Sequence, residues 1–267
     1  AHQIMELNKI NSLVELFFKK YLEITKKNND EPFLKWLKND EVDFLSWKQV
    51  GCKISILSQY LKNKVSKGDR VVLLSENRPE WLITDIAIMN AGGITVPLFT
   101  TYSEKDYEYI IKDCKPKICI VSNNQKKKIE KFITDKIELL SIDNINSQVE
   151  SLKLKSGFSF NQEISRKDLA CIIYTSGTTG NPKGVMLSHG GILSNCEGAQ
   201  EILDTLVKYE KPVFLTWLPL SHSYEHAVQF VQISLGARVY YAESLEKLIM
   251  NIATAKPTIM TAVPRFY

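Results

Sequence analysis

The fold of this chain is best predicted from the stretch Tyr174-Thr175-Ser176-Gly177-Thr178-Thr179-Gly180-Asn181-Pro182-Lys183-Gly184-Val185. One apolar run, beginning at Leu169, leads into the stretch, and a second, Val185-Met186-Leu187, leads out of it. Glycines let backbone N–H groups approach a ligand closely, hydroxyl side chains add donors, and a lysine adds a positive charge suited to phosphate. Successive N–H groups in such a turn form an anion-binding concavity. The stretch therefore predicts a phosphate-binding loop.

An ordinary solvated turn is the alternative interpretation, because the same residue types also build turns. A turn explains the glycines, but it does not explain hydroxyl side chains at nearly every other place and a lysine at the end. Two well-known phosphate motifs are excluded. The stretch lacks the Gly-Lys-Ser/Thr of a Walker A loop, and it lacks the Gly-x-Gly-x-x-Gly of a dinucleotide fold.

The same stretch resembles the phosphate-binding signature of the adenylate-forming (AMP-binding) superfamily, which includes acyl-CoA synthetases, luciferases and peptide-synthetase adenylation domains. The resemblance implies ATP as a ligand. Because its side chain carries a positive charge that can approach phosphate oxygens, we assign Lys183 to the β- and γ-phosphates. Backbone N–H groups across Ser176–Gly180, including Gly177, share that task, and the hydroxyls of Thr178 and Thr179 add donors. The family further implies that Thr175 helps to hold Mg²⁺, which bridges phosphate oxygens.

Composition points to an ordinary globular protein. The 267 residues are 44% hydrophobic and 24% charged, and the net charge of +4 is too mild to indicate a nucleic-acid partner. The basic run Lys126-Lys127-Lys128 is expected on a solvated helix face. The five cysteines are odd in number and include no Cys-x-x-Cys pair, which argues against a disulfide framework or a structural zinc site and favours a cytoplasmic protein. No apolar run approaches the ~18 residues that span a bilayer.

Alternating strand and helix patterns predict an α/β fold with mostly parallel sheets flanked by helices. Helices are expected over 5–22, from the cap Ser46 to about 61, and over 79–90, 103–114, 188–207, 224–235 and 245–255. Strands are expected within 31–45 and over 70–75, 94–99, 117–121, 137–142, 213–218, 238–242 and 258–263. We divide the chain into a first α/β portion (1–143), a linker-like excursion (144–167) and a second portion (168–267) that starts with the phosphate loop.

A second motif follows the strand predicted at 213–218. It reads Trp217-Leu218-Pro219-Leu220-Ser221-His222-Ser223-Tyr224-Glu225-His226 and resembles the second core motif of acyl-CoA synthetases. The resemblance implies that His222 lies beside the acyl carboxylate and that Trp217 and Tyr224 wall the acyl pocket. Ligands of open α/β sheets bind beyond the carboxyl ends of strands, which agrees with this placement. The alternative is a histidine that caps a helix and is satisfied by backbone.

Two further segments resemble long-chain fatty acyl-CoA synthetases within the superfamily. They are Tyr240-Tyr241-Ala242-Glu243-Ser244 and Thr261-Ala262-Val263-Pro264-Arg265-Phe266-Tyr267. The resemblance implies a ligase that uses ATP, Mg²⁺ and coenzyme A to convert a long-chain fatty acid, through an acyl-adenylate, into an acyl-CoA thioester. Aryl, amino and acetyl substrates remain alternatives. Fatty acids partition into bilayers, so peripheral attachment at the inner face of a membrane is compatible with this function. The oligomeric state is not readable from the sequence.

Two other functions stay open. His222-x-x-Glu225-His226 matches a zinc-peptidase pattern, in which two histidines on one helical face bind zinc and the glutamate acts as base. A non-catalytic module that binds a nucleotide or an acyl group would need only the loop. Members of the superfamily continue well past the equivalent of Tyr267, with adenine, ribose and lid residues downstream. We therefore expect residues 1–267 to be an incomplete amino-terminal domain that is inactive by itself.

Overall fold

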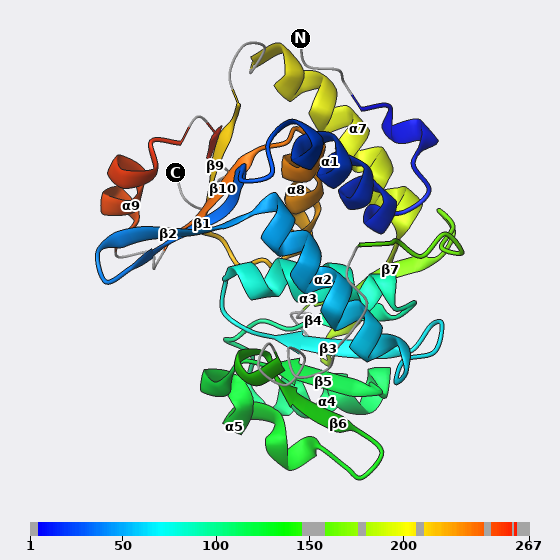
Figure 1. Cartoon of the computed structure of the whole chain (residues 1–267). Helices are drawn as coiled ribbons and strands as arrows, with labels where there is room; N and C mark the ends of the chain where they lie inside the picture. The colour runs from blue at the N-terminus through cyan, green and yellow to red at the C-terminus, as the bar shows by residue number, and fades with distance from the viewer. Residues whose placement is uncertain are drawn as a thin grey trace.

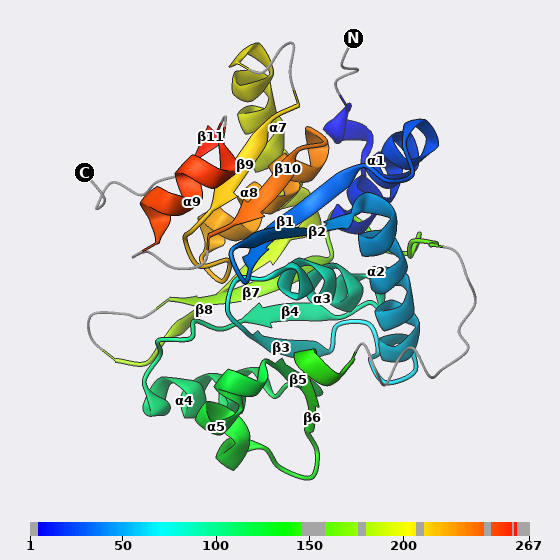
Figure 2. The ribbon, with the colours of Figure 1, turned by 60° about the vertical axis from the view of Figure 1, so that its left-hand side comes forward.

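The computed structural model describes residues 5–145, 158–175, 180–206, 211–242, 247–257 and 259–260. These residues form two β-sheets separated by a layer of helices, with further helices on the outer face of each sheet (Figures 1 and 2). The predicted α/β class with mostly parallel sheets is confirmed.

The larger sheet has the strand order β6-β5-β3-β4-β7-β8. Its strands are β3 (Arg70–Leu74), β4 (Ile94–Pro97), β5 (Ile118–Val121), β6 (Glu138–Ser141), β7 (Leu169–Thr175) and β8 (Lys183–Ser188). Neighbours are parallel except β7 and β8, which pair antiparallel. Because β4 adds to one side of β3 and β5 to the other, the strand order reverses at β3, between β3 and β5. Their carboxyl ends therefore mark a topological switch point, where open α/β sheets bind ligands.

The smaller sheet has the strand order β11-β9-β10-β1-β2. Its strands are β1 (Pro32–Lys38), β2 (Glu41–Ser46), β9 (Val213–Thr216), β10 (Arg238–Tyr241) and β11 (Ile259–Met260). The antiparallel hairpin β1–β2 joins the edge of β10, with Leu34 paired to Val239. The hairpin is local, but its docking onto a strand two hundred residues later is not visible in the sequence pattern. In this sheet the strand order reverses at β9, because β10 adds to one side of β9 and β11 to the other.

In the part of the chain that the structure describes, five helices form the layer between the sheets, and smaller ones cover the outside (Figure 1). The inner helices are α1 (Leu13–Lys27), α2 (Trp47–Lys62), α3 (Pro79–Asn90), α7 (His189–Leu206) and α8 (Ser223–Ser234). Helices α4 (Glu104–Cys114) and α5 (Lys126–Ile129) cover the outer face of the larger sheet, and α9 (Leu248–Ala255) covers that of the smaller. Short 3₁₀ turns are η1 (Leu7–Lys9), η2 (Asn123–Gln125) and η3 (Glu130–Phe132).

Strand β3 shows how one sheet serves two cores. Val71 and Leu73 belong to the core shared with the inner helices, whereas Val72 and Leu74 pack with α4 on the other side. Side chains of successive strand residues point to opposite faces, so a strand buried on both faces reads as a continuous apolar run.

The amino-terminal prediction was wrong in detail. A single helix was expected over 5–22, but the chain forms η1 and then starts α1 at Leu13. The Ser12 hydroxyl accepts from the Glu15 backbone N–H at 3.0 Å, which satisfies one of the unpaired donors of a new helix. Leu7 and Ile10 are nevertheless buried, so the apolar spacing identified core positions correctly.

Other local predictions are confirmed. Ser46 starts α2 with a complete capping box, in which Gln49 returns a bond to the Ser46 N–H. Pro79 occupies the first turn of α3, and Ser103 caps α4. Within the basic run, Lys126 and Lys127 are exposed, but the Lys128 ammonium donates to the Thr100 carbonyl oxygen at 2.5 Å.

The excursion over 144–167 is partly packed. Residues 146–157 lie outside the described residues, but Phe158 and Phe160 place their rings 5.3 and 4.8 Å from that of Phe18 on α1.

All five cysteines are free thiols. Among the described residues no helix has the length and apolar character needed to cross a membrane.

Buried His189 predicts a loss of stability in acid. Its Nδ1 accepts from the Leu13 N–H at 3.1 Å, and burial lowers the pKa of the imidazole to about 4. The unfolded chain binds this proton near its ordinary pKa of 6.5, so stability falls as pH falls from about 6.5 towards 4, by about 3 kcal/mol. Urea unfolding at a series of pH values measures the slope. A His189→Gln variant should show a shallower slope, and an unchanged one would contradict the assignment.

Candidate functional site

The predicted phosphate loop connects β7 to β8, and its two ends face each other. Thr175 and Lys183 are paired across the hairpin, and both are exposed. Gly180 has φ +114°, a backbone conformation that favours glycine. Predicted ligands Ser176, Gly177, Thr178 and Thr179 lie outside the described residues.

The side chain of Lys183 is available for a ligand. No described residue forms a salt bridge or hydrogen bond with its ammonium, although the chain has many carboxylates. Strand β8 itself is an exposed edge, where Val185 is 46% and Met186 65% exposed. Of the apolar run after the loop, only Leu187 packs against the core, where it is partly buried.

Two tyrosines hold the entrance to the loop. The Tyr174 hydroxyl donates to Asp113 Oδ2 at 2.6 Å, and the Tyr102 hydroxyl donates to the Tyr174 carbonyl oxygen at 2.6 Å. Burial and then the Asp113 carboxylate raise the pKa of Tyr174, so its hydroxyl stays a donor at neutral pH. Sequence reasoning did not identify Tyr102 or Asp113, because nothing local in the sequence places them at the end of β7.

The second motif lies in the loop after β9, and Asn77 clamps it. The Asn77 amide nitrogen donates to the Leu218 carbonyl oxygen at 2.7 Å, and its amide oxygen accepts from the Leu220 N–H at 3.0 Å. Asn77 follows β3, so a side chain from the switch point of the larger sheet positions a loop from the smaller one. This residue was also missed, since a single asparagine after a strand carries no motif.

His222 caps α8 with one ring nitrogen. Its Nδ1 accepts from the Tyr224 N–H at 3.2 Å, which assigns the proton of the neutral ring to Nε2. The predicted capping role is therefore present. It leaves Nε2 unpaired among the described residues and able to donate to a ligand oxygen.

Trp217 and Tyr224, the two aromatic residues predicted to line the acid pocket, lie in environments that differ from each other. Trp217 packs with Leu215 and Tyr240 on the outer face of the smaller sheet, and Tyr224 is 52% exposed. The ring that lies against His222 belongs to Phe99, with centroids 6.4 Å apart and an interplanar angle of 67°. Phe99 follows β4, which is paired with β3, so the larger sheet again supplies the contact.

A series of contacts connects the two motifs. From His222 it runs to Phe99, then to Tyr102, whose ring centroid is 5.2 Å from that of Phe99, and then to the Tyr174 carbonyl oxygen. Thr175 is the next residue. Segments far apart in the sequence therefore meet at the carboxyl ends of β4, β7 and β9. An acid held at His222 and a phosphate chain held at the loop would share this edge.

The zinc-peptidase pattern does not form a metal site in the described part of the chain. The side chain of His226 is 0% exposed; its Nε2 lies 2.8 Å from Asp85 Oδ2 and its Nδ1 3.9 Å from Cys171 Sγ. Among the described residues no group of three or more histidines, cysteines or carboxylates could hold a metal ion. Helix α8 places His226 in the buried layer between the sheets, whereas His222 lies at the amino-terminal end of the helix.

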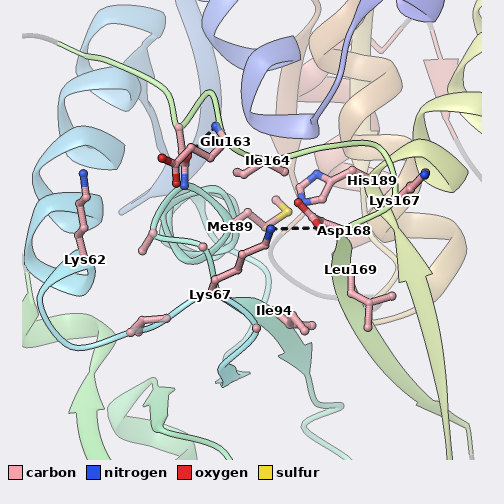
Figure 3. Close-up of a pocket in the computed structure, with 16 residues that line it drawn as sticks. Lys62, Lys67, Met89, Ile94, Glu163, Ile164, Lys167, Asp168, Leu169 and His189 are labelled. Atoms are coloured by element: carbon pink, nitrogen blue, oxygen red, sulfur yellow. Dashed lines mark hydrogen bonds and ion pairs between the residues drawn. The ribbon is translucent and has the colours of Figure 1, made fainter.

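A cavity of about 480 Å³ lies away from this site (Figure 3). Its walls include Lys67, Ile94, Asp168, Leu169 and His189, which sit near the amino ends of β3, β4 and β7. Lys67 extends towards Asp168, with 3.6 Å between Nζ and Oδ1. Because the strands are parallel, this cavity is at the edge of the sheet opposite the predicted phosphate loop.

Comparisons with known proteins agree with the sequence resemblance. A family described as AMP-binding enzyme matches residues 23–267. Fatty acyl-CoA synthetase A of Dictyostelium discoideum is 28% identical over 254 residues, covering 86% of this chain and 37% of that protein. Long-chain-fatty-acid–CoA ligase 1 of Cavia porcellus is 29% identical over 266 residues, covering 89% and 38%. The chain thus spans a little over a third of the length of these relatives.

Solved structures support the fold. A fatty acyl-adenylate ligase from L. pneumophila, in complex with acyl adenylate and pyrophosphate, aligns with a TM-score of 0.77 and 21% sequence identity. The alignment covers 97% of this chain and 46% of that one.

Proposed function

Since this chain belongs to the AMP-binding enzyme family, we propose that the full-length protein is an acid–thiol ligase. It activates a carboxylic acid with ATP and transfers the acyl group to coenzyme A. The acid is a long-chain fatty acid, because the relatives named above are fatty acyl-CoA synthetases and long-chain ligases. The observation that carries the proposal is the route of contacts from His222 through Phe99 and Tyr102 to the end of β7.

The proposed reaction has two steps. A carboxylate oxygen attacks the α-phosphorus of ATP, the bond to the β-phosphate oxygen breaks, and pyrophosphate leaves with the electron pair. The coenzyme A thiol, after losing its proton to solvent, then attacks the acyl carbon and displaces AMP. Both reactants of the first step are anions, so catalysis consists of positioning and of charge stabilisation.

Lys183 supplies the positive charge in this proposal. At ~4 Å from a phosphate oxygen its ammonium contributes about 4 kcal/mol at an effective dielectric constant near 20. Its lack of a described protein partner fits this role, since an ammonium already paired with a carboxylate would be neutralised. The backbone of 176–180 is assigned to the same phosphates.

Thr175 is proposed as the protein's contribution to the magnesium site. Its side chain is exposed at the start of the loop, and its Oγ1 is only weakly engaged, 3.5 Å from the Lys183 carbonyl oxygen. A hydroxyl oxygen next to a phosphate site is a suitable ligand for this hard cation. When bound, magnesium neutralises phosphate charge. In this proposal the Thr175 hydroxyl would hold and orient the magnesium ion, and it makes no bond to the acid.

His222 is proposed to hold the acid. Its Nε2–H is directed by the fixed Nδ1 bond to the helix, and it can donate to one carboxylate oxygen while the other attacks. Tyr224 and Trp217 remain proposed wall residues of the acyl pocket. A stand-alone binder of nucleotide or acyl groups is the competing function, because residues 1–267 contain only part of the length of the relatives.

Acid-dependent exchange of labelled pyrophosphate into ATP tests the proposal in the full-length protein. We expect exchange with hexadecanoate and much weaker exchange with acetate, benzoate or amino acids. His222→Ala should raise the KM for the acid at least tenfold with little change in the KM for ATP. Calorimetric binding of ATP without any acid-dependent exchange would instead identify a binding module.

A further inference from the structure

The loop after β4, residues 99–102, lies between the two predicted binding motifs. At one end the ring of Phe99 contacts that of His222, and at the other the Tyr102 hydroxyl is bonded to the Tyr174 carbonyl oxygen. Neither motif includes this loop. Its position makes it a wall that faces both the acid histidine and the strand leading into the phosphate loop.

Hydrogen bonds hold this wall in place. The Tyr107 hydroxyl donates to the Phe99 carbonyl oxygen at 2.6 Å, and Lys128 Nζ donates to that of Thr100. Burial raises the pKa of Tyr107 to about 12 and also raises the pKa of Tyr102, so both hydroxyls remain donors at neutral pH. A side chain on such a fixed segment can discriminate between ligands by shape, because the backbone cannot easily move to accommodate a poor fit.

The topology explains why this wall faces the site. The larger sheet reverses its strand order at β3, whose two neighbours are β4 and β5, and the smaller one at β9, whose neighbours are β10 and β11. The loop after β9 is held by Asn77 from the end of β3 and by Phe99 from the end of β4. The loop that follows β9 therefore meets the residues that follow β3 and β4, and Phe99 lies at this junction.

We propose that Phe99 is a specificity-determining residue that contacts the carbons next to the carboxylate of the acid. The proposal rests on the proposed function. A carboxylate bonded to His222 Nε2 at about 3 Å brings its α-carbon to the ring packed against that histidine. A straight methylene chain can pass along the ring, whereas a methyl branch at the α-carbon collides with it. One methyl group in such a pocket is worth about 10–200-fold in kcat/KM.

Selectivity between hexadecanoate and 2-methylhexadecanoate tests this in the full-length enzyme. The unmutated enzyme should prefer the straight acid, and Phe99→Ala should raise the relative kcat/KM for the branched acid at least tenfold. Phe99→Leu, which keeps most of the volume, should give a smaller change in the same direction. Phe44→Ala is the matched control, because Phe44 is 45% exposed on β2, and it should leave the ratio unchanged.

The possible outcomes distinguish a failure of the Phe99 proposal from a failure of the proposed ligase function on which it depends. If Phe99→Ala does not fold, Phe99→Leu decides, since a change in its ratio supports the contact. Wild-type ratios in every folded Phe99 variant would overturn the inference and leave the ligase intact. Absence of acid-dependent exchange in the unmutated enzyme would overturn the proposed function, and with it this assignment.

Discussion

Replacing Asp85 by Ala is expected to lower the free energy of unfolding by about 3–5 kcal/mol. Asp85 Oδ2 lies 2.8 Å from His226 Nε2, and both side chains are 0% exposed. The variant leaves the imidazole buried without its counter-ion, and a buried unpaired charge is far more costly than a broken surface pair. Urea unfolding of the purified protein, followed by circular dichroism, measures the loss.

The pair also predicts a dependence on alkaline pH. Burial opposes protonation of His226, but the Asp85 carboxylate and Cys171 hold the pKa of the imidazole well above its ordinary value. His189 on α7 opposes this shift only weakly, because it is itself neutral above about pH 4. The stabilisation is therefore fully present below about pH 6.5 and is lost as pH rises through the raised pKa. The Asp85→Ala variant should not show this decrease in stability at alkaline pH.

An exposed ion pair provides the control. Glu108 and Lys112 lie one turn apart on α4, 2.7 Å apart, with side chains 43% and 73% exposed. Glu108→Ala should change stability by less than about 1 kcal/mol, since solvent screens such pairs. The double variant Asp85→Ala/His226→Leu should lose less than the two single variants together. Equal losses for Asp85→Ala and Glu108→Ala would refute the importance of burial here.

Lys183→Ala is expected to lower pyrophosphate exchange in the full-length enzyme at least tenfold without unfolding it. A tenfold loss corresponds to about 1.4 kcal/mol, well within what an ammonium beside phosphate contributes. The fold should tolerate the change, because Lys183 is exposed and no described residue depends on its ammonium. Exchange rates and thermal unfolding of the same preparation measure both effects.

A matched lysine makes the comparison specific. Lys62 is exposed on α2 and lines the cavity at the opposite edge of the larger sheet, so Lys62→Ala removes the same charge away from the predicted loop. It should leave exchange within a factor of about two, since surface charges more than a Debye length away are screened at ordinary salt. Lys183→Arg should retain more activity than Lys183→Ala, because the charge is kept. Unchanged exchange in Lys183→Ala would remove this residue from the site.

Local chemistry made several elements predictable. Ser46, Pro79 and Ser103 mark helix starts because a hydroxyl or a fixed φ satisfies the first turn wherever the helix later packs. The amino-terminal helix was predicted too early because the apolar spacing of Leu7 and Ile10 suits both a helix and a buried turn. In that region the cap Ser12 decided the boundary.

Site residues outside the motifs were not predictable. Asn77, Phe99 and Tyr102 each follow a strand or occupy a loop, and nothing in their neighbours marks them as contacts of a loop more than seventy residues away. The His222/Glu225/His226 pattern was ambiguous for the same reason. Only packing shows that His226 faces Asp85 and that His222 faces Phe99.

By itself, the sequence determined the fold class, the caps and the family, because periodicity, turn chemistry and a long glycine–hydroxyl–lysine motif are local properties. Only the tertiary structure decided that two sheets bring the loops after β3, β4 and β9 together and that one histidine is buried while its neighbour caps a helix. Those outcomes depend on strand order and on the burial of helix faces, which are set by contacts between residues far apart in the chain.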